Sequence, residues 1–213
     1  MSEFQYVELG NACISQEVLQ KFDCGHPDFN DFLVNDAVKC SKNGDGVTYV
    51  LVDEEEYDNK KISTIFAFAT IQSTSLQYCD IENTDKIYSI SGAEIRYFAI
   101  AKKFHRQTAY LIDPNKYYST IFFEWLLADL YEMSTKTIGF QAIFLRANEA
   151  GEKLYRRKKF VDATKYIIPY EEDDPLGKCI PMCLMIQDNI YCNIKSILTK
   201  KVFPRYDGIL CDW

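Results

Sequence analysis

The chain has 213 residues, of which 47% are hydrophobic and 15% aromatic, a size and composition that suit one compact domain with its own core. The formal net charge of −7 argues against broad, salt-sensitive binding to nucleic acid or to an anionic membrane surface. No apolar run reaches the roughly 18 residues of a transmembrane helix, and the polar start MSEFQYVELG lacks a secretory signal. We therefore expect a soluble, cytoplasmic protein that does not bind a membrane.

The cysteines and histidines do not form a recognisable metal site. There are eight cysteines and two histidines, and the cysteine pair closest in sequence is Cys179 and Cys183. The gap between these two differs from that of a zinc knuckle, and the chain has no sign of export into an oxidising compartment. We expect reduced, mostly buried thiols, no disulfide framework and no metal cofactor.

The first half of the chain predicts strands separated by a helical region. Residues 27–39 carry apolar side chains at helical spacing and begin with a proline, which suits the first helical position. The acidic segment 54–61 is expected to be a solvated connection between two strands. The predicted strands are 6–9, 47–52, 62–73 and 93–101, and the predicted helices are 15–22 and 27–39.

Strands and helices alternate in the second half. Asp113 and Pro114 are expected to start a long helix, as its N-cap and first helical residue. The expected elements are helix 114–135, strand 140–147, helix 148–159, and strands 161–169 and 178–186. The whole pattern, β-α-α-β-β-β-α-β-α-β-β, predicts the α/β class, with a central mixed β-sheet flanked by helices.

Most of the helix 148–159 is explained by helix stereochemistry. Asn148 can cap its amino end, and acidic residues there and basic residues at the other end suit the helix dipole. Capping and the helix dipole do not explain Tyr155. A tyrosine beside the core-facing Leu154 can bury its ring and direct its hydroxyl toward the end of the preceding strand.

The segment from Asn148 to Phe160 resembles the fourth helix of the GNAT superfamily of acyl-CoA-dependent N-acetyltransferases. The family pattern is an asparagine, six residues, a tyrosine preceded by Leu or Phe, and a basic run ending in Gly-Phe; Asn148, Leu154, Tyr155 and Phe160 match it. The resemblance implies that Asn148 contacts the cofactor. It also implies that Tyr155 lies near the cofactor sulfur and acts as general acid. Gly151 stands where the family usually has alanine, and Lys159 stands where it has glycine.

Two further segments resemble the same family. The segment from Phe22 to Ala37 is similar to the early helices of a branch that includes toxin-like acetyltransferases, and AEIRYFAIAKKF resembles the central strand. In the family this strand pairs with the pantetheine arm, which implies backbone contacts at Phe98, Ala99 and Ile100. The resemblance covers roughly residues 4–186. We expect a GNAT-like domain over 1–186 and a C-terminal extension, 187–213, packed on it.

The phosphate-binding loop departs most from the family. Family members usually follow the central strand with a Gln/Arg-x-x-Gly-x-Gly/Ala loop, whose backbone N–H groups hold the pyrophosphate. Here His105, Arg106 and Gln107 begin this pattern, but no glycine follows before Pro114. Either a longer loop directs amides and cationic side chains at the phosphates, or the cofactor site has decayed. The side chains in question are Lys102, Lys103, Arg106 and Lys116.

The resemblance implies an acyltransferase that moves acetyl from acetyl-CoA to a primary amine in a ternary complex, with Tyr155 as acid. Glu94, near the start of the central strand, is the candidate base, acting through water. The acceptor is a small molecule, a protein amino group or, as in the toxin branch, an aminoacyl-tRNA; no other nucleic-acid partner is expected. Two other readings stay open: a silent acyl-CoA-binding regulatory domain, and an interaction protein without cofactor. A homodimer is also left open.

Overall fold

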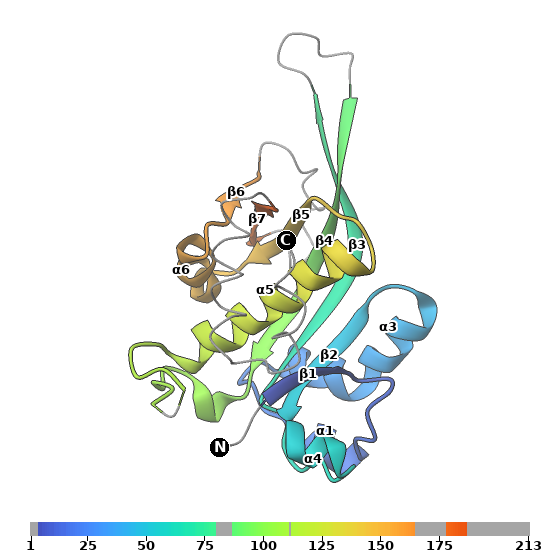
Figure 1. Ribbon diagram of the computed structural model, residues 1–213, viewed down its shortest axis with the longest axis vertical. Coiled ribbons are helices and arrows are strands. Elements are labelled where there is room, and N and C mark those ends of the chain that lie inside the picture. The colour runs from blue at the N-terminus through green and yellow to red at the C-terminus, as the bar shows by residue number, and fades with distance from the viewer. Residues whose placement is uncertain (1–3, 80–86, 111, 165–177, 187–213) are drawn as a thin grey trace, which may run out of the picture. The chain divides into compact units, whose positions relative to one another are not determined.

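The computed structural model describes residues 4–79, 87–110, 112–164 and 178–186 (Figure 1). The predicted extension 187–213 and most of the predicted strand 161–169 lie outside these residues. None of the described helices is long and apolar enough to cross a membrane. The chain divides into two compact units, each described below by itself; the single domain predicted over 1–186 stays a prediction. The first unit contains residues 4–72 and 97–128, and the second contains residues 73–96, 129–164 and 178–186.

Seven strands among the described residues form one mixed sheet, hydrogen bonded in the order β1-β2-β3-β4-β5-β7-β6. The pairs β1–β2, β2–β3, β5–β7 and β6–β7 are antiparallel, whereas β4 and β5 are parallel. This sheet confirms the predicted fold class. The strands are β1 (Phe4–Glu8), β2 (Val47–Asp53), β3 (Ala67–Cys79), β4 (Ile87–Ile100), β5 (Ala142–Ala147), β6 (Val161–Asp162) and β7 (Ile180–Met185).

The first unit packs its early helices on one face of β2 and β3. Buried apolar side chains from both strands and from these helices form one cluster, which includes Leu33, Val50 and Phe68. A buried hydrogen bond of 2.8 Å between the hydroxyls of Thr48 and Thr70 ties the two strands together. The core of this unit is therefore largely apolar, with its buried hydroxyls paired.

The predicted helix over 27–39 is present but is interrupted. It consists of α2 (Pro27–Asp31), a π-helical turn (Phe32–Asp36) and α3 (Ala37–Asn43), which ends at Gly44 with a φ of 80°. The positive φ is the usual way to end a helix at glycine. Ahead of it lies α1 (Gln16–Gln20). The segment predicted as a connection contains a short helix, α4 (Glu54–Asp58), because Asp53 accepts a hydrogen bond from the Glu56 amide and caps it.

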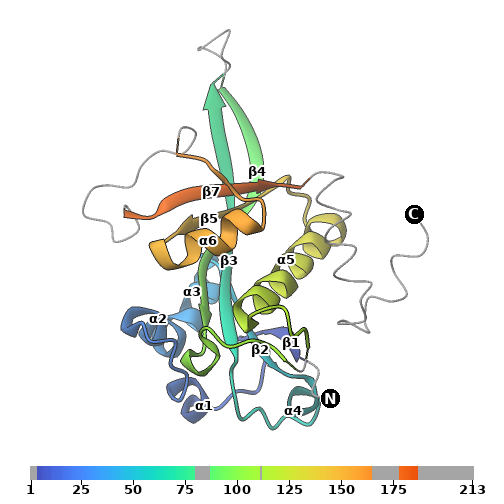
Figure 2. The same cartoon turned by 90° about the vertical axis from the view of Figure 1, so that its left-hand side faces the viewer.

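In the second unit β5 lies between β4 and β7 in the sheet (Figure 2). The β4–β5 ladder pairs Gly92 with Ala142 and runs to Ile95 and Leu145. A Cβ atom at Gly92 would lie 2.1 Å from the Phe144 ring, so the ring covers the space where a side chain would stand. Because Gly92 has no side chain, the large Phe144 ring of β5 can lie directly against the β4 backbone at this position.

Two longer helices complete the structure, with a short 3-10 helix, η2 (Lys102–Phe104), after β4. The helix α5 spans Tyr118–Lys136, and α6 spans Glu149–Arg157 beside β5 (Figures 1 and 2). The prediction that Asp113 caps α5 is wrong. Asp113 instead accepts a hydrogen bond from the Asn115 amide in a turn, and Tyr117 forms an isolated bridge with Thr108 just before the helix.

The five cysteines whose side chains the structure describes carry free thiols. Cys24 and Cys183 are buried, and burial raises the pKa of both thiols. Cys13 is exposed, while Cys40 and Cys179 are half-buried, so the expectation of mostly buried thiols is not met among these five. The raised pKa values keep the two buried thiols neutral and unreactive.

Candidate active site

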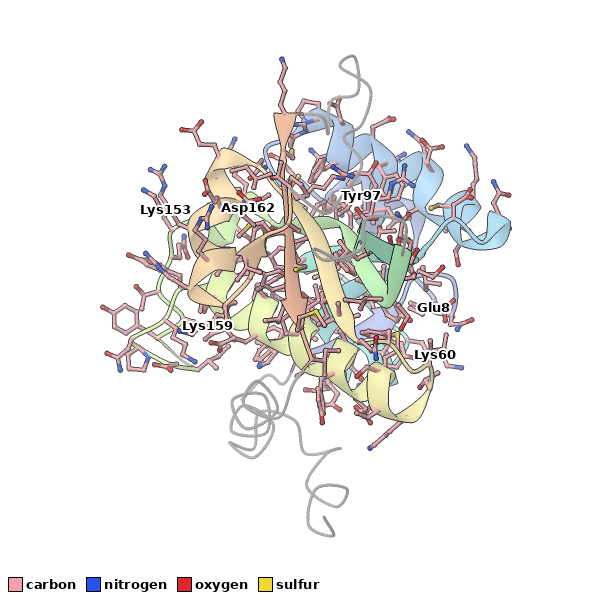
Figure 3. All side chains as sticks on the ribbon, turned by 90° about the horizontal axis from the view of Figure 1, so that it is seen from above. Glu8, Lys60, Tyr97, Lys153, Lys159 and Asp162 are labelled. Carbon is pink, nitrogen blue, oxygen red and sulfur yellow. The ribbon has the colours of Figure 1, made fainter. Side chains whose placement is uncertain are left out.

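Helix α6 is built as its sequence predicts. The side-chain oxygen of Asn148 accepts a 2.8 Å hydrogen bond from the Gly151 amide, which caps the helix. Glu152 and Arg156 form a 2.7 Å ion pair one turn apart. Lys153 and Lys159 are exposed (Figure 3). The charged residues of this helix therefore have structural roles, and the Asn148 side-chain oxygen is engaged by the cap.

Neither the Asn148 cap nor the Glu152–Arg156 ion pair explains the presence of Tyr155 in α6. Its side chain is half-buried, and its ring centroid lies 6.1 Å from that of Phe160. Burial, and secondarily the charge of Cys179, raise the pKa of the Tyr155 hydroxyl well above its usual range. The Tyr155 hydroxyl therefore keeps its proton to a higher pH than an exposed tyrosine and can act as a proton donor.

The turn after α6 adopts the backbone that the family builds with glycine. Lys159 has a φ of 71°, and the Phe160 amide donates to the carbonyl of Tyr155 at 3.1 Å. A non-glycine residue in this left-handed region costs about 1–2 kcal/mol. The turn geometry is therefore retained although the glycine is not.

Glu94, the candidate base, lies beside an arginine that the sequence analysis did not single out. Its carboxylate is 3.8 Å from Nε of Arg146 on β5, and each side chain is only 12% exposed. Arg146 follows Leu145, the residue at which the β4–β5 ladder ends. A single charged residue inside the otherwise apolar run FQAIFLRA was the sequence signal for this pair, because a charge within a buried strand needs a partner.

The end of β4 has few free backbone groups. Ala99 and Ile100 are buried, and a ring nitrogen of His105 lies 2.9 Å from the carbonyl oxygen of Ile100. The Phe98 ring packs 5.1 Å from that of Phe123. Of the three predicted backbone contacts, Ile100 already has its carbonyl engaged inside the chain, and His105 is the residue that engages it.

In the loop after β4, several backbone N–H groups donate hydrogen bonds to carbonyls of the same loop. Seven of its N–H groups donate to carbonyls within the loop, and the amide of Tyr118, the first residue of α5, donates to the carbonyl of Gln107 at 3.0 Å. The seven donors and acceptors are Phe104 to Ala101, His105 to Lys102, Gln107 to Phe104, Ala109 to Lys116, Ile112 to Ala109, Asp113 to Ala109 and Lys116 to Asp113. Arg106 takes a positive φ of 57° and is exposed. A cradle of open amides, as a glycine-rich loop provides, is therefore not formed by these groups.

The cations of this loop have different surroundings. Lys116 lies 2.8 Å from Glu124 and 3.9 Å from Asp113, so its charge is compensated. The Lys103 ammonium lies over the rings of Phe66 and Phe104, 5.3 and 5.1 Å from their centroids. Lys102 and Lys103 also line a cavity of about 350 Å³, with Lys21, Asp23, Ser63 and Thr64 among its other residues. Positive charge near the end of β4 thus comes from Lys102, Lys103 and Arg106.

Several solved structures are similar to this chain. A bacterial toxin aligns with a TM-score of 0.63 over 92% of this chain and 97% of its own, at 18% identity. A point mutant of the toxin AtaT aligns with a TM-score of 0.59 over 93% of each chain, at 15% identity. The AtaTR complex bound with AcCoA aligns with a TM-score of 0.57 over 94% and 99%, at 18% identity. A scan of protein-family models and a search among curated proteins found no match.

These alignments cover nearly the whole of each chain, with TM-scores above those of unrelated folds. The chain has the GNAT fold. Identities of 15–18% establish the GNAT fold and leave the chemistry to be argued from this chain's own residues. The resemblance first seen in α6 and β4 thus extends to the whole architecture.

Proposed function

We propose that this protein is an N-acetyltransferase that moves the acetyl group of acetyl-CoA to a primary amine. The observation that carries the proposal is the position of Tyr155, a half-buried tyrosine beside Phe160 on the capped helix α6 of a GNAT fold. The Asn148 cap and the turn at Lys159 hold the two ends of this helix.

The reaction is direct transfer in a ternary complex. The amine nitrogen forms a bond to the thioester carbonyl carbon, the carbon–sulfur bond breaks, and Tyr155 gives its proton to the departing sulfur. The proton lost by the amine nitrogen leaves through a base, and the phenol is restored from solvent.

Glu94 is the proposed base, acting through a water molecule. Nε of Arg146 lies 3.8 Å from the Glu94 carboxylate, and both side chains are largely shielded from solvent. The ion pair also holds the carboxylate in place, and a positioned base contributes about 10²–10⁴-fold to the rate. Arg146 therefore belongs to the proposed machinery as a positioning residue.

The residues near β4 fit acetyl-CoA through charge. Because the loop amides are largely used within the loop, we propose that Lys102, Lys103 and Arg106 hold the phosphates as cations. Backbone groups of Phe98 and Ala99 pair with the pantetheine arm. Binding by charge rather than by dipoles predicts stronger salt dependence than a glycine-rich loop has.

An aminoacyl-tRNA is the second candidate acceptor. It carries a primary amine, and the toxin AtaT, whose structure complexed with acetyl-methionyl-tRNAfMet aligns with a TM-score of 0.56 over 91% of this chain, is a specific reason to include it. A related alignment is to AtaT bound to the C-terminus of the antitoxin AtaR and acetyl-CoA. Acetyl-CoA and aminoacyl-tRNA are both cytoplasmic, so the proposal places the protein there.

A thiol-release assay with an amine panel tests the proposal. The panel contains small amines, peptides with free amino groups, and aminoacyl-tRNA, with acetyl-CoA as donor. We expect acceptor-dependent release of CoA and an acetylated product of matching mass. Binding of acetyl-CoA without transfer to any member would support the silent acyl-CoA-binding reading instead. Faster transfer to aminoacyl-tRNA than to its free amino acid would identify the toxin-like acceptor.

A further inference from the structure

Gly151 is a residue of α6 that helix stability does not explain. It lies in the first turn of the helix, where the family usually has alanine, and glycine is among the least favourable residues in a helix. Its backbone φ is not in the left-handed region, so glycine is not required there for conformational reasons. The absence of a side chain at residue 151 must therefore be explained by the side chains packed around it.

The space beside Gly151 is filled by Tyr155. A Cβ atom at residue 151 would lie 2.7 Å from Cε2 and 3.1 Å from Cζ of the Tyr155 ring. Real Cβ atoms essentially never approach other atoms closer than 3.0 Å, so the ring occupies a place that only glycine leaves open. Cζ is the ring carbon that carries the hydroxyl, so this contact lies at the functional end of the side chain.

Gly151 also contacts the other residue that matches the family pattern. Its amide donates to the side-chain oxygen of Asn148 at 2.8 Å, and a Cβ atom would lie 3.2 Å from that oxygen. The Phe160 ring centroid is 6.1 Å from that of Tyr155. The Tyr155 ring therefore has Phe160 and the backbone of the first turn at Gly151 among its neighbours.

We infer that Gly151 is a positioning residue, whose missing side chain sets where the Tyr155 hydroxyl lies. The inference rests on the proposed function for its catalytic consequence, although the ring position itself does not depend on it. A methyl group at residue 151 would push the hydroxyl-bearing end of the ring away from the first turn. Displacements of this kind reduce rates strongly, because proton donation requires hydrogen-bond contact.

The substitution Gly151→Ala separates positioning from stability. Alanine favours the helix, and the clashing atoms are the far end of a side chain that can rotate, so the fold should tolerate it. We expect an unchanged or slightly higher melting temperature, kcat lowered by about tenfold or more, and KM for acetyl-CoA within about twofold. Gly139→Ala is the matched control, since a Cβ there meets nothing within 4 Å, and it should leave kcat unchanged.

A second variant and a second readout complete the test. In a Tyr155→Phe background Gly151→Ala should cause no further loss of kcat, because there is no hydroxyl left to displace. In protein with ¹³Cζ-tyrosine, the Tyr155 resonance, assigned by its loss in Tyr155→Phe, should shift in Gly151→Ala and stay in place in Gly139→Ala. An unmoved resonance overturns the inference even if the protein proves to transfer no acetyl group. A moved resonance with unchanged kcat overturns its catalytic part alone.

Discussion

Tyr155→Phe should lower kcat for acetyl transfer by about 10²–10⁴-fold, the range that a general acid contributes. The variant keeps the ring that packs beside Phe160 and over Gly151, so the fold and the binding of acetyl-CoA should be retained. Without the hydroxyl, the sulfur must leave as a thiolate in surroundings that disfavour charge. Steady-state thiol release, with native and variant protein compared at saturating acetyl-CoA, measures the effect.

Tyr110→Phe is the control for this experiment. Tyr110 is 76% exposed, so removal of its hydroxyl should change neither kcat nor KM. If Tyr155→Phe retains the native rate, Tyr155 is not the acid, and the proton reaches the sulfur by another route. If it loses binding of acetyl-CoA as well, the hydroxyl contributes to binding and not only to proton donation, because the variant keeps the ring.

The raised pKa of Tyr155 also predicts how stability depends on pH. In the unfolded chain the phenol titrates near its usual pKa of about 10, whereas in the folded protein burial keeps it protonated to higher pH. Below pH 10 both states are protonated and stability is unaffected. As the pH rises from about 10 toward the folded pKa, only the unfolded state releases its proton, so stability is lost. Tyr155→Phe should show less of this alkaline decline.

Arg146→Ala should destabilise the protein by about 3 kcal/mol, the lower end of the cost of breaking a buried ion pair. The substitution leaves the Glu94 carboxylate 12% exposed and without the charge that lies 3.8 Å from it. Urea unfolding followed by circular dichroism measures the change in free energy.

Arg156→Ala is the matched control, because it breaks an arginine–glutamate pair in the same unit at the surface. The Arg156 side chain is 49% exposed, and exposed pairs of this kind contribute about 0.3–0.5 kcal/mol. A double variant, Glu94→Gln with Arg146→Ala, should recover part of the stability, since both charges of the pair are then removed. Equal losses for Arg146→Ala and Arg156→Ala would show that the Glu94–Arg146 contact has no special weight.

The sequence predicts elements well where one residue acts on its immediate neighbours. Asn148 caps α6 as predicted. The left-handed turn at Lys159 forms although Lys159 departs from the family's glycine. The prediction for Asp113 fails because an aspartate before a proline suits a helix N-cap and a turn equally well. In the structure Asp113 forms a turn, and α5 begins only at Tyr118. The residues next to Asp113 are compatible with both structures, so the local sequence does not distinguish them.

The candidate site was harder to predict because its contacts join distant segments. The Glu94–Arg146 pair depends on the register of β4 against β5, which the sequence does not contain. The use of loop amides within the loop, and of the Ile100 carbonyl by His105, requires the folded path of the chain. Gly151 was visible as a departure from the family, but only the position of the Tyr155 ring explains it.

Titration with acetyl-CoA in a calorimeter tests the central claim most directly. We predict saturable binding of acetyl-CoA with a Kd below about 1 mM, within the usual range for enzyme substrates. This binding should weaken as the salt concentration rises. Lys102→Ala and Arg106→Ala should each weaken it, whereas Tyr155→Phe should not. No heat of binding at millimolar acetyl-CoA would contradict both the enzyme and the acyl-CoA-binding readings, and would leave a protein that uses the GNAT fold for another purpose.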